Sequence, residues 1–310
     1  MRTSSIGSWF AVLATAVLAT VTAAATPGGA PMTEAVARGH TQLRLAAAPA
    51  ARRAAPARAQ VAIIIDDLGE QQHAGLRAIA LPGPVAVAFL PGARFTPAQA
   101  GLAHRQGKEV LLHLPLQPGG EARAHPTALR AASAEQMREY FRAALDAVPH
   151  AAGVNNHQGS LATQLAEPMD WLMREVARRP GLYFVDSRTS SLSVAFRAAR
   201  RHGVPSAERR VFLDAHRGEG AVRAALEELV IKALRDERAL AIGHPYPETL
   251  KVLGEELPKL ARYGVRLVAP SELIARQSGP RGPTPRLKLS PALTLATGAA
   301  IPAATSAQTP

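Results

Sequence analysis

The amino-acid sequence predicts an α/β domain whose parallel strands form a closed or nearly closed barrel. Short apolar runs of strand character alternate with helical patterns over residues 61–275, and this alternation is typical of a mostly parallel sheet covered by helices. Six of the runs also end on a polar residue that is suited to chemistry. Seven or eight such strand–helix units favour a barrel, and an open doubly wound sheet is the alternative fold.

The expected elements follow one another along the chain. Strands are expected at 61–65, 109–112, 153–154, 182–185, 211–213, 240–243 and 265–268. Helices are expected at 97–106, 133–147, 168–179, 193–202, 220–236 and 247–263, with a final short helix capped by Ser271. Two of the helix starts carry specific signals: Ser133 and Gln136 form a capping box, and Pro247 suits a first helical turn.

The two ends of the chain differ in composition from its middle. A charge at Arg2, an uncharged apolar stretch and small residues near Ala23 and Ala25 predict a secretory signal peptide over 1–25. Residues 26–59, an Ala/Pro/Arg-rich linker, and 278–310, a Pro/Ala-rich tail, are expected to be disordered. The folded domain is then expected at 60–277. No other stretch is long and apolar enough to span a bilayer, so we expect an exported protein of the periplasm or cell envelope; a retained membrane anchor is the alternative.

Composition narrows the functional classes. The net charge of +12 comes mainly from the flanks, because residues 61–275 hold 26 Lys and Arg against 23 Asp and Glu. A nucleic-acid-binding domain is expected to carry its own basic patch, so nucleic acid is disfavoured as a partner. Cysteine is absent, which excludes a disulfide framework and thiolate sites. A metal ion would be held by His and carboxylate ligands, with zinc as the leading candidate.

Polar side chains follow the expected strands at their carboxyl ends. These residues are Asp66, Asp67, His113, Asn155, Asn156, His157, Asp186, Asp214 and His244. In parallel α/β folds these strand ends face one rim, where active sites are built. Carboxylates and imidazoles together on one rim are typical of a metal-assisted hydrolase. Structural roles are the alternative: a helix cap for the Asp pair, an ion pair with Arg188 for Asp186, and a structural pair for Asp214 and His216.

Five segments of the chain resemble the divergent polysaccharide deacetylase family. They are VAIIIDDLG (61–69), EVLLHLP (109–115), GVNNHQGS (153–160), FVDSRT (184–189) and IGHPYP (242–247). They occur in order over about residues 60–275, nearly the whole expected domain. The resemblance implies a relative of the carbohydrate esterase deacetylases, with an irregular (β/α) barrel of about seven strands.

The resemblance also implies roles for four residues. In ordinary members of the wider group, an Asp-Asp pair supplies a base and a metal ligand, two histidines at i and i+4 complete the metal site, and a later histidine is the general acid. By position, Asp66 resembles the base, Asp67 and His113 the ligands, and His244 the acid. The fourth residue after His113 is Gln117 rather than His, so one ligand is missing from the ordinary set.

We predict that His157 replaces the missing ligand, so that a divalent metal ion is held by Asp67, His113 and His157. The predicted activity is metal-dependent removal of acetyl groups from an N-acetylated cell-envelope polysaccharide, either peptidoglycan or a related glycan. The alternative is a non-catalytic saccharide-binding or envelope-assembly protein that kept the barrel and lost catalysis, and the missing second histidine favours this alternative.

Four further residues receive roles in this hypothesis. Asp186 is predicted to orient His244 for protonation of the departing amine. Asn155, Asn156 and Tyr246 are predicted to bind the substrate.

Overall fold

The structure is a computed structural model that describes residues 59–275, except 121–122, 126–127 and 130–132. The predicted signal peptide, nearly all of the linker and the tail lie outside the described residues, so these assignments stay predictions. None of the helices in the described range combines the length and apolarity that a bilayer crossing requires.

The described residues form nine strands, eight α-helices and two 3₁₀ helices. The strands are β1 (Ala59–Leu68), β2 (Ala86–Phe89), β3 (Val110–Leu116), β4 (Ala151–Gln158), β5 (Tyr183–Asp186), β6 (Ser206–Glu208), β7 (Val211–Phe212), β8 (Arg238–Gly243) and β9 (Val265–Leu267). The α-helices are α1 (Gln72–Ile79), α2 (Thr96–Arg105), α3 (Ala134–Asp146), α4 (Ala166–Ala177), α5 (Ala195–Arg201), α6 (Glu219–Asp236), α7 (Pro247–Glu256) and α8 (Pro270–Ala275). The 3₁₀ helices are η1 (Ala162–Gln164) and η2 (Leu257–Tyr263).

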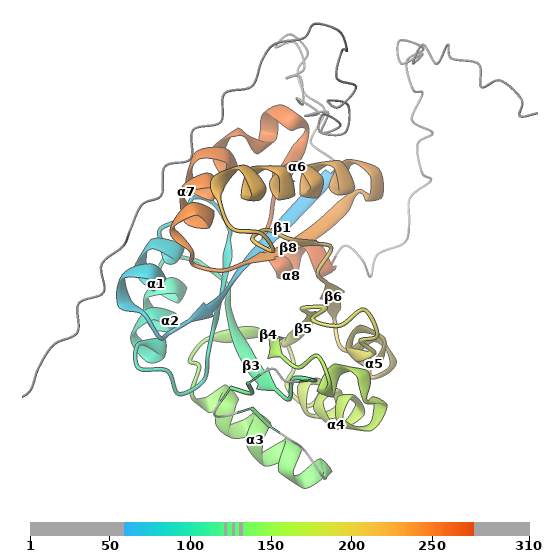
Figure 1. Cartoon of the computed structure of the whole chain (residues 1–310). Helices are drawn as coiled ribbons and strands as arrows, with labels where there is room; N and C mark the ends of the chain where they lie inside the picture. The colour runs from blue at the N-terminus through green and yellow to red at the C-terminus, as the bar shows by residue number, and fades with distance from the viewer. Residues whose placement is uncertain (1–58, 121–122, 126–127, 130–132, 276–310) are drawn as a thin grey trace, which may run out of the picture. The chain divides into compact units, whose positions relative to one another are not determined.

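The strands form one parallel sheet that curls into an incomplete barrel. Its order is β6-β5-β4-β3-β2-β1-β8-β7, and β9 pairs with the first residues of β1. Most of the helices line the outside, with α6 and α7 on the side of β1 and β8, and α3, α4 and α5 on the side of β3, β4, β5 and β6 (Figure 1). The barrel is open between the end strands β6 and β7. Only Arg209 and Arg210 join these two strands, so two residues of the chain cross this gap. The predicted α/β barrel is therefore confirmed, in its nearly closed form.

The residues of β1 explain why the sheet is covered on both faces. Val61, Ile63 and Ile65 are fully buried in the cluster beneath the helices. Ala62 and Ile64, which alternate with them, lie in a second cluster inside the curl, where Leu273 and Ile274 of α8 also pack. Because successive strand side chains point to opposite faces, a continuous apolar run is the pattern expected of a strand buried on both sides.

Several elements differ from the sequence-based expectation. Asn155, Asn156 and His157, expected in a loop, lie inside β4, because strand pairing with β3 along its length outweighs their low strand propensity. The helix expected over 247–263 ends as α7 and continues as η2. Pro258 lies at this change, and proline removes a helical hydrogen bond.

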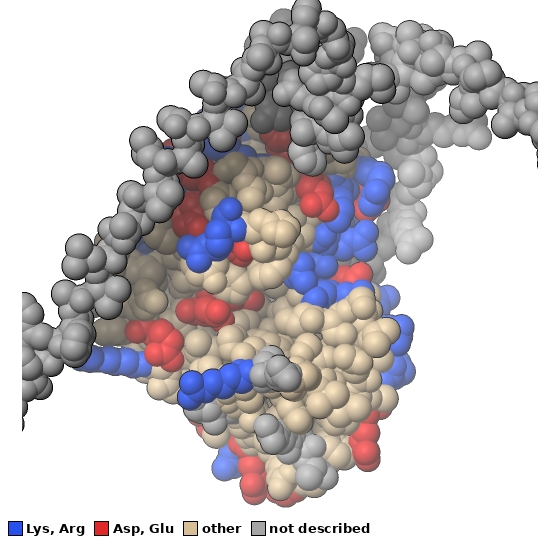
Figure 2. Space-filling view, viewed as in Figure 1, with Lys and Arg blue, Asp and Glu red and all other residues tan. Residues whose placement is uncertain are grey.

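The visible face of the domain carries charges of both signs. Red and blue side chains are interspersed there, with blue ones gathered toward the right edge (Figure 2). This distribution fits the near balance of charge within residues 61–275.

Candidate metal centre and catalytic site

The carboxyl end of β1 turns two adjacent carboxylates toward one site. A regular strand would direct Asp66 and Asp67 to opposite faces. Asp67 instead has φ 58°, and the pairing register with β2 shifts between Ile65 and Leu68. Asp tolerates left-handed φ better than most residues, and an irregular strand end of this kind re-aims a side chain. Both carboxylates therefore reach the same group of histidines.

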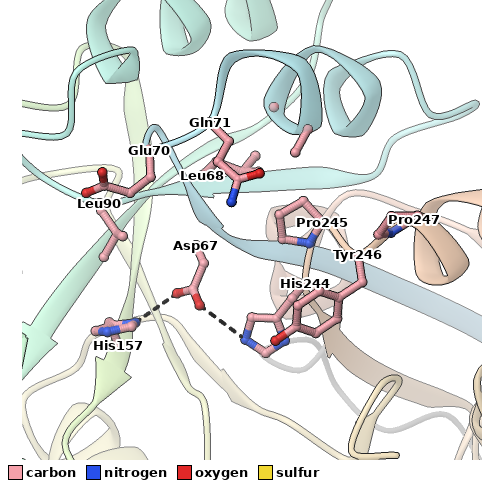
Figure 3. A pocket seen from close by; sticks show the side chains of 12 residues that line it. Asp67, Leu68, Glu70, Gln71, Leu90, His157, His244, Pro245, Tyr246 and Pro247 are labelled. Carbon is pink, nitrogen blue, oxygen red and sulfur yellow. Dashed lines mark hydrogen bonds and ion pairs between the residues drawn. The ribbon is translucent and has the colours of Figure 1, made fainter. Parts of the chain in front are cut away.

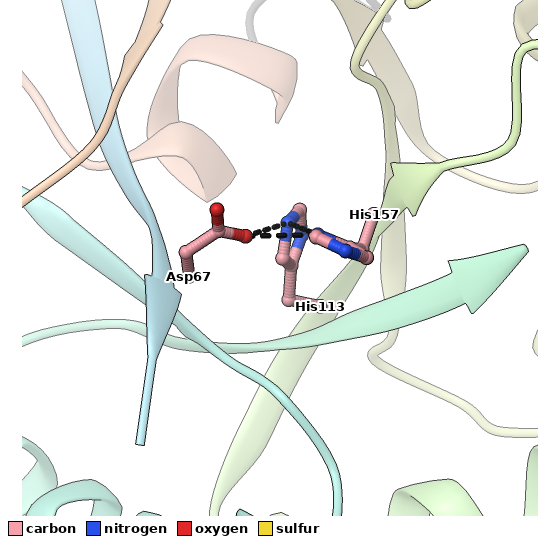
Figure 4. Close-up of side chains that lie close together, drawn as sticks. All are labelled: Asp67, His113 and His157. Atoms are coloured by element: carbon pink, nitrogen blue, oxygen red, sulfur yellow. Dashed lines mark hydrogen bonds and ion pairs between the residues drawn. The ribbon is translucent and has the colours of Figure 1, made fainter. Parts of the chain in front are cut away.

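The three predicted metal ligands converge in the structure. Oδ1 of Asp67 lies 3.1 Å from Nε2 of His113 and 2.8 Å from Nδ1 of His157. The two nitrogens are 3.1 Å apart, and Figure 4 shows the three side chains pointing toward one another. Among the described residues, these three form the only such group of potential ligands.

The donor set fits a divalent ion such as zinc. Ligand atoms at tetrahedral angles, each about 2.1 Å from an ion, are about 3.4 Å apart, so the observed atoms need only small outward shifts. One carboxylate and two imidazoles are ligands that zinc accepts. Three protein ligands leave one position open, as hydrolytic zinc sites require. Gln117 stands where the resemblance implies a second ligand histidine, and the group of three contains His157 instead.

Asn155 fixes how His113 faces the site. Nδ1 of His113 donates to Oδ1 of Asn155 at 2.9 Å, because an amide oxygen can only accept. Nδ2 of Asn155 donates to Oδ1 of Asp66 at 2.8 Å and to Oγ of Ser187 at 3.3 Å. The other ring nitrogen of His113, Nε2, is thereby directed at Asp67. The buried amide of Asn155 also connects Asp66, the predicted base, to His113, a predicted ligand.

The predicted substrate contacts of two asparagines are corrected. Asn155 is 0% exposed and Asn156 is 1% exposed, so neither side chain is open to a substrate. Asn156 accepts from the Ser187 backbone N–H and donates to the Gln158 carbonyl. These amides bind the ends of β4 and the following loops together.

The orientation of His244 comes from Asp214 rather than from Asp186. Nδ1 of His244 lies 3.0 Å from Oδ1 of Asp214, whose Oδ2 accepts from the His244 backbone N–H and from Thr249. Nε2 of His244 is thus turned toward the site and lies 3.7 Å from Oδ2 of Asp67.

Asp186 instead has a structural role. It is fully buried and accepts hydrogen bonds from the Arg188 N–H, the Ser193 hydroxyl and the Phe196 N–H. Its carboxylate therefore holds the loop after β5 and the start of α5, and the predicted pairing of Asp186 with His244 is wrong.

Burial and mutual charge separate the pKa values of the site. Burial raises the pKa of Asp66 above its usual value, although His113 and His244 act against this shift. Burial would also raise the pKa of Asp67, but hydrogen bonds from His113 and His157 hold it well below its usual range. Burial lowers the pKa of His113, but Asp66 and Asp67 more than offset this effect and raise it to about 9. The Asp214 hydrogen bond similarly offsets burial and raises the pKa of His244.

The raised pKa of His113 predicts pH-dependent metal binding. Below about pH 9 a proton on His113 competes with the ion, whereas Asp67 remains ionised. Apparent affinity should therefore rise with pH by about tenfold per unit for one displaced proton. Competition titrations with a chelator between about pH 6.5 and 8.5 measure this slope. A flat profile after correction for the chelator would contradict the assignment of His113 as a protonated ligand.

A pocket opens beside Asp67, His157 and His244. It has a volume of about 430 Å³ and is lined by Asp67, Leu68, Glu70, Gln71, Ala74, Gly75, Leu90, His157, His244, Pro245, Tyr246 and Pro247. Figure 3 shows Tyr246 next to His244, with Asp67 between His157 and His244. The guanidinium of Arg217 lies 3.8 Å from the centroid of the Tyr246 ring. Tyr246, unlike the two asparagines, therefore lies where a substrate can reach it.

Two residues near the site received no catalytic role from the sequence. Asp214 is one of the expected rim residues, but the sequence offers His216 as its partner, whereas the structure pairs it with His244, 30 positions away. His125 shows no pattern in the sequence, yet its ring centroid lies 5.3 Å from that of His157. A search for long-range carboxylate–histidine pairs across adjacent strands could have found the pair of Asp214 and His244.

One family model, two curated relatives and a solved structure match the chain. A family model described as divergent polysaccharide deacetylase matches residues 63–274. The chain is 36% identical over 216 residues to the uncharacterized protein YibQ of Escherichia coli K12, covering 69% of this chain and 67% of that protein. It is 35% identical over 205 residues to an uncharacterized protein of Haemophilus influenzae, covering 66% of this chain and 73% of that protein. A crystal structure of an uncharacterized Agrobacterium tumefaciens protein has the same fold, with a TM-score of 0.67, 24% identity, and coverage of 74% of this chain and 93% of that one.

Proposed function

Because the chain belongs to the divergent polysaccharide deacetylase family, we propose that it is a metal-dependent hydrolase that removes acetyl groups from an N-acetylated cell-envelope polysaccharide. The observation that carries this proposal is the convergence of Asp67, His113 and His157 beside a buried carboxylate and a carboxylate-oriented histidine. Peptidoglycan or a related glycan is the proposed substrate, and zinc is the proposed ion.

The proposed ligands would be Oδ1 of Asp67, Nε2 of His113 and Nδ1 of His157. When bound there, the ion would supply Lewis acidity, which polarises a carbonyl oxygen and lowers the pKa of a water to about 7. Asn155 holds His113 in the tautomer that this role needs. The left-handed backbone at Asp67 directs its carboxylate to the same point.

Asp66 is the proposed general base. Oδ2 of Asp66 lies 3.6 Å from Nε2 of His113, so the carboxylate is next to the proposed ligands. Its burial raises the pKa, which makes it a better proton acceptor than an ordinary exposed Asp. Asp66 would take the proton of the attacking water as that water adds to the acetamide carbonyl.

His244 is the proposed general acid. Asp214 holds its Nδ1 and stabilises the imidazolium, and Nε2 faces the site. It would give its proton to the departing amine as the C–N bond breaks. His113 contacts one oxygen of Asp67 and His244 approaches the other, so the proposed acid and the proposed ligand His113 lie at different oxygens of this carboxylate.

The non-catalytic alternative rests on Gln117, which stands where the ordinary family pattern has its second histidine. A saccharide-binding protein would need the pocket and Tyr246 but no metal ion. Acetate release from chitooligosaccharides and peptidoglycan fragments, measured with several divalent metals added, separates the two functions. Metal-dependent release supports the hydrolase, and binding of the same glycans without release under any metal supports the binding protein.

The location of the protein is part of the proposal. The signal-like N-terminus, with Arg2 and the small residues at Ala23 and Ala25, supports export to the periplasm or cell envelope. Mass spectrometry of protein recovered from the envelope should then show a start near Ala24 or Thr26, whereas an intact Met1 on protein from the soluble fraction would rule out cleavage.

A further inference from the structure

A fourth imidazole, that of His125, lies beside the proposed ligand His157. The half-buried side chain of His125 lies on the segment between β3 and α3. Its ring centroid is 5.3 Å from that of His157, with an interplanar angle of 81°. The corresponding values for His113 and His157 are 4.9 Å and 77°. The two ring pairs are thus similar in separation and inclination.

This position is fixed from β4. Gln158 directly follows His157, and its Oε1 accepts from the His125 backbone N–H at 3.0 Å. Its Nε2 donates to the carbonyl of Arg123 at 3.1 Å. One side chain therefore fastens the backbone of His125 next to a proposed ligand.

The backbone of Gln158 is itself unusual. Its φ is 51°, a left-handed conformation that is unfavourable for a residue other than glycine. Its carbonyl accepts from Nδ2 of Asn156 and Oγ1 of Thr189, at 2.8 Å and 2.9 Å. These bonds offset the strain and hold the Gln158 side chain against the segment that carries His125.

The ring separations are compatible with imidazoles that share an ion. Two imidazoles on one tetrahedral ion, with metal–nitrogen bonds of about 2.0–2.1 Å, have ring centroids roughly 5 Å apart. Both pairs that include His157 meet this value. The nitrogens of His125 are outside the convergent group of three, so its ring must turn about its side-chain bonds to reach the ion.

We propose that His125 is a fourth protein ligand that closes the coordination shell of the ion in the substrate-free protein. This inference rests on the proposed metal site. An ion with four protein ligands has no open position, so His125 must leave before a water or a substrate oxygen can bind. Binding of substrate would displace the imidazole by ligand exchange, with no change in oxidation state.

The test compares metal binding by the full-length parent and by His125→Ala, with His125→Gln as a second variant that keeps a polar side chain. Affinity for zinc is measured by chelator competition, and the positions of the visible absorption bands are measured with cobalt, because these positions depend on which ligand atoms surround the ion. Both variants should lose at least roughly tenfold in affinity, the smaller end of the range for weakened ligand shells, and their cobalt bands should shift, because a water oxygen that takes the place of the imidazole is a weaker-field ligand than nitrogen.

The matched control is His104→Ala. His104 stacks on His150 with a centroid separation of 4.1 Å, and His150 precedes β4 at the end opposite His157. This control should leave affinity and absorption unchanged. The inference is overturned if either quantity in the His125 variants equals that of the parent while His157→Ala loses the ion. If the parent itself binds no ion, the proposed hydrolase fails together with this inference.

Discussion

Replacing Asp66 by Asn should lower the turnover of acetate release by roughly 10²–10⁴-fold, the usual scale for loss of a general base. The amide keeps the size of the side chain and an oxygen that accepts from Asn155, as Oδ1 of Asp66 does at 2.8 Å. It cannot accept the proton of the attacking water. Because Asp66 is outside the convergent group of ligands, the variant should bind the metal ion as the parent does.

The matched control for this variant is Glu70→Gln. Glu70 is an exposed carboxylate that lines the pocket together with Asp67, His157 and His244, so it reports the effect of removing a nearby negative charge. Its turnover should change by less than about tenfold, since an exposed charge acts weakly on its surroundings. Equal losses in the two variants, or full turnover in Asp66→Asn, would exclude Asp66 as the base.

Replacing Asp67 by Asn should remove the metal ion and the activity together. Oδ1 of Asp67 is the atom that contacts both ligand histidines, and a neutral amide is a poorer ligand than a carboxylate for a divalent ion. Asn is also the substitution least harmful to the backbone, because it tolerates the φ of 58° at this position. Far-UV circular dichroism should therefore remain that of the parent.

Metal content after dialysis, measured by atomic emission, separates the two members of the pair. Asp66→Asn should retain the ion and Asp67→Asn should lose it, although the substitutions are chemically identical and adjacent. His157→Ala should behave as Asp67→Asn does. If Asp67→Asn keeps both the ion and its turnover, the acidic pair serves only to end β1.

The rim of polar residues was predictable because the carboxyl ends of parallel strands all lie at one edge of the sheet. Asp67, His113 and His157 follow or interrupt apolar runs, and parallel pairing brings the ends of β1, β3 and β4 to one side. The family resemblance added the separation of base from ligand. The replacement of the missing histidine by His157 was an inference from this neighbourhood, and the structure brings that residue to the other two.

The features that sequence reasoning missed depend on long-range pairing. The partner of His244 is Asp214 because β7 pairs with β8 and Leu213 continues that contact, whereas Asp186 belongs to the distant β5. The strand β2 is also absent from the elements expected from the sequence. The left-handed φ of Asp67 has no local signal comparable to a glycine, and without it two adjacent carboxylates would not share a site.

The central claim is that Asp67, His113 and His157 hold one ion. Anomalous diffraction at the zinc absorption edge, from crystals of the zinc-loaded protein, tests it most directly. The account predicts one strong peak at bonding distance, about 2.0–2.2 Å, from Oδ1 of Asp67, Nε2 of His113 and Nδ1 of His157. At saturating zinc, a peak bound elsewhere or no peak among these three atoms would contradict it.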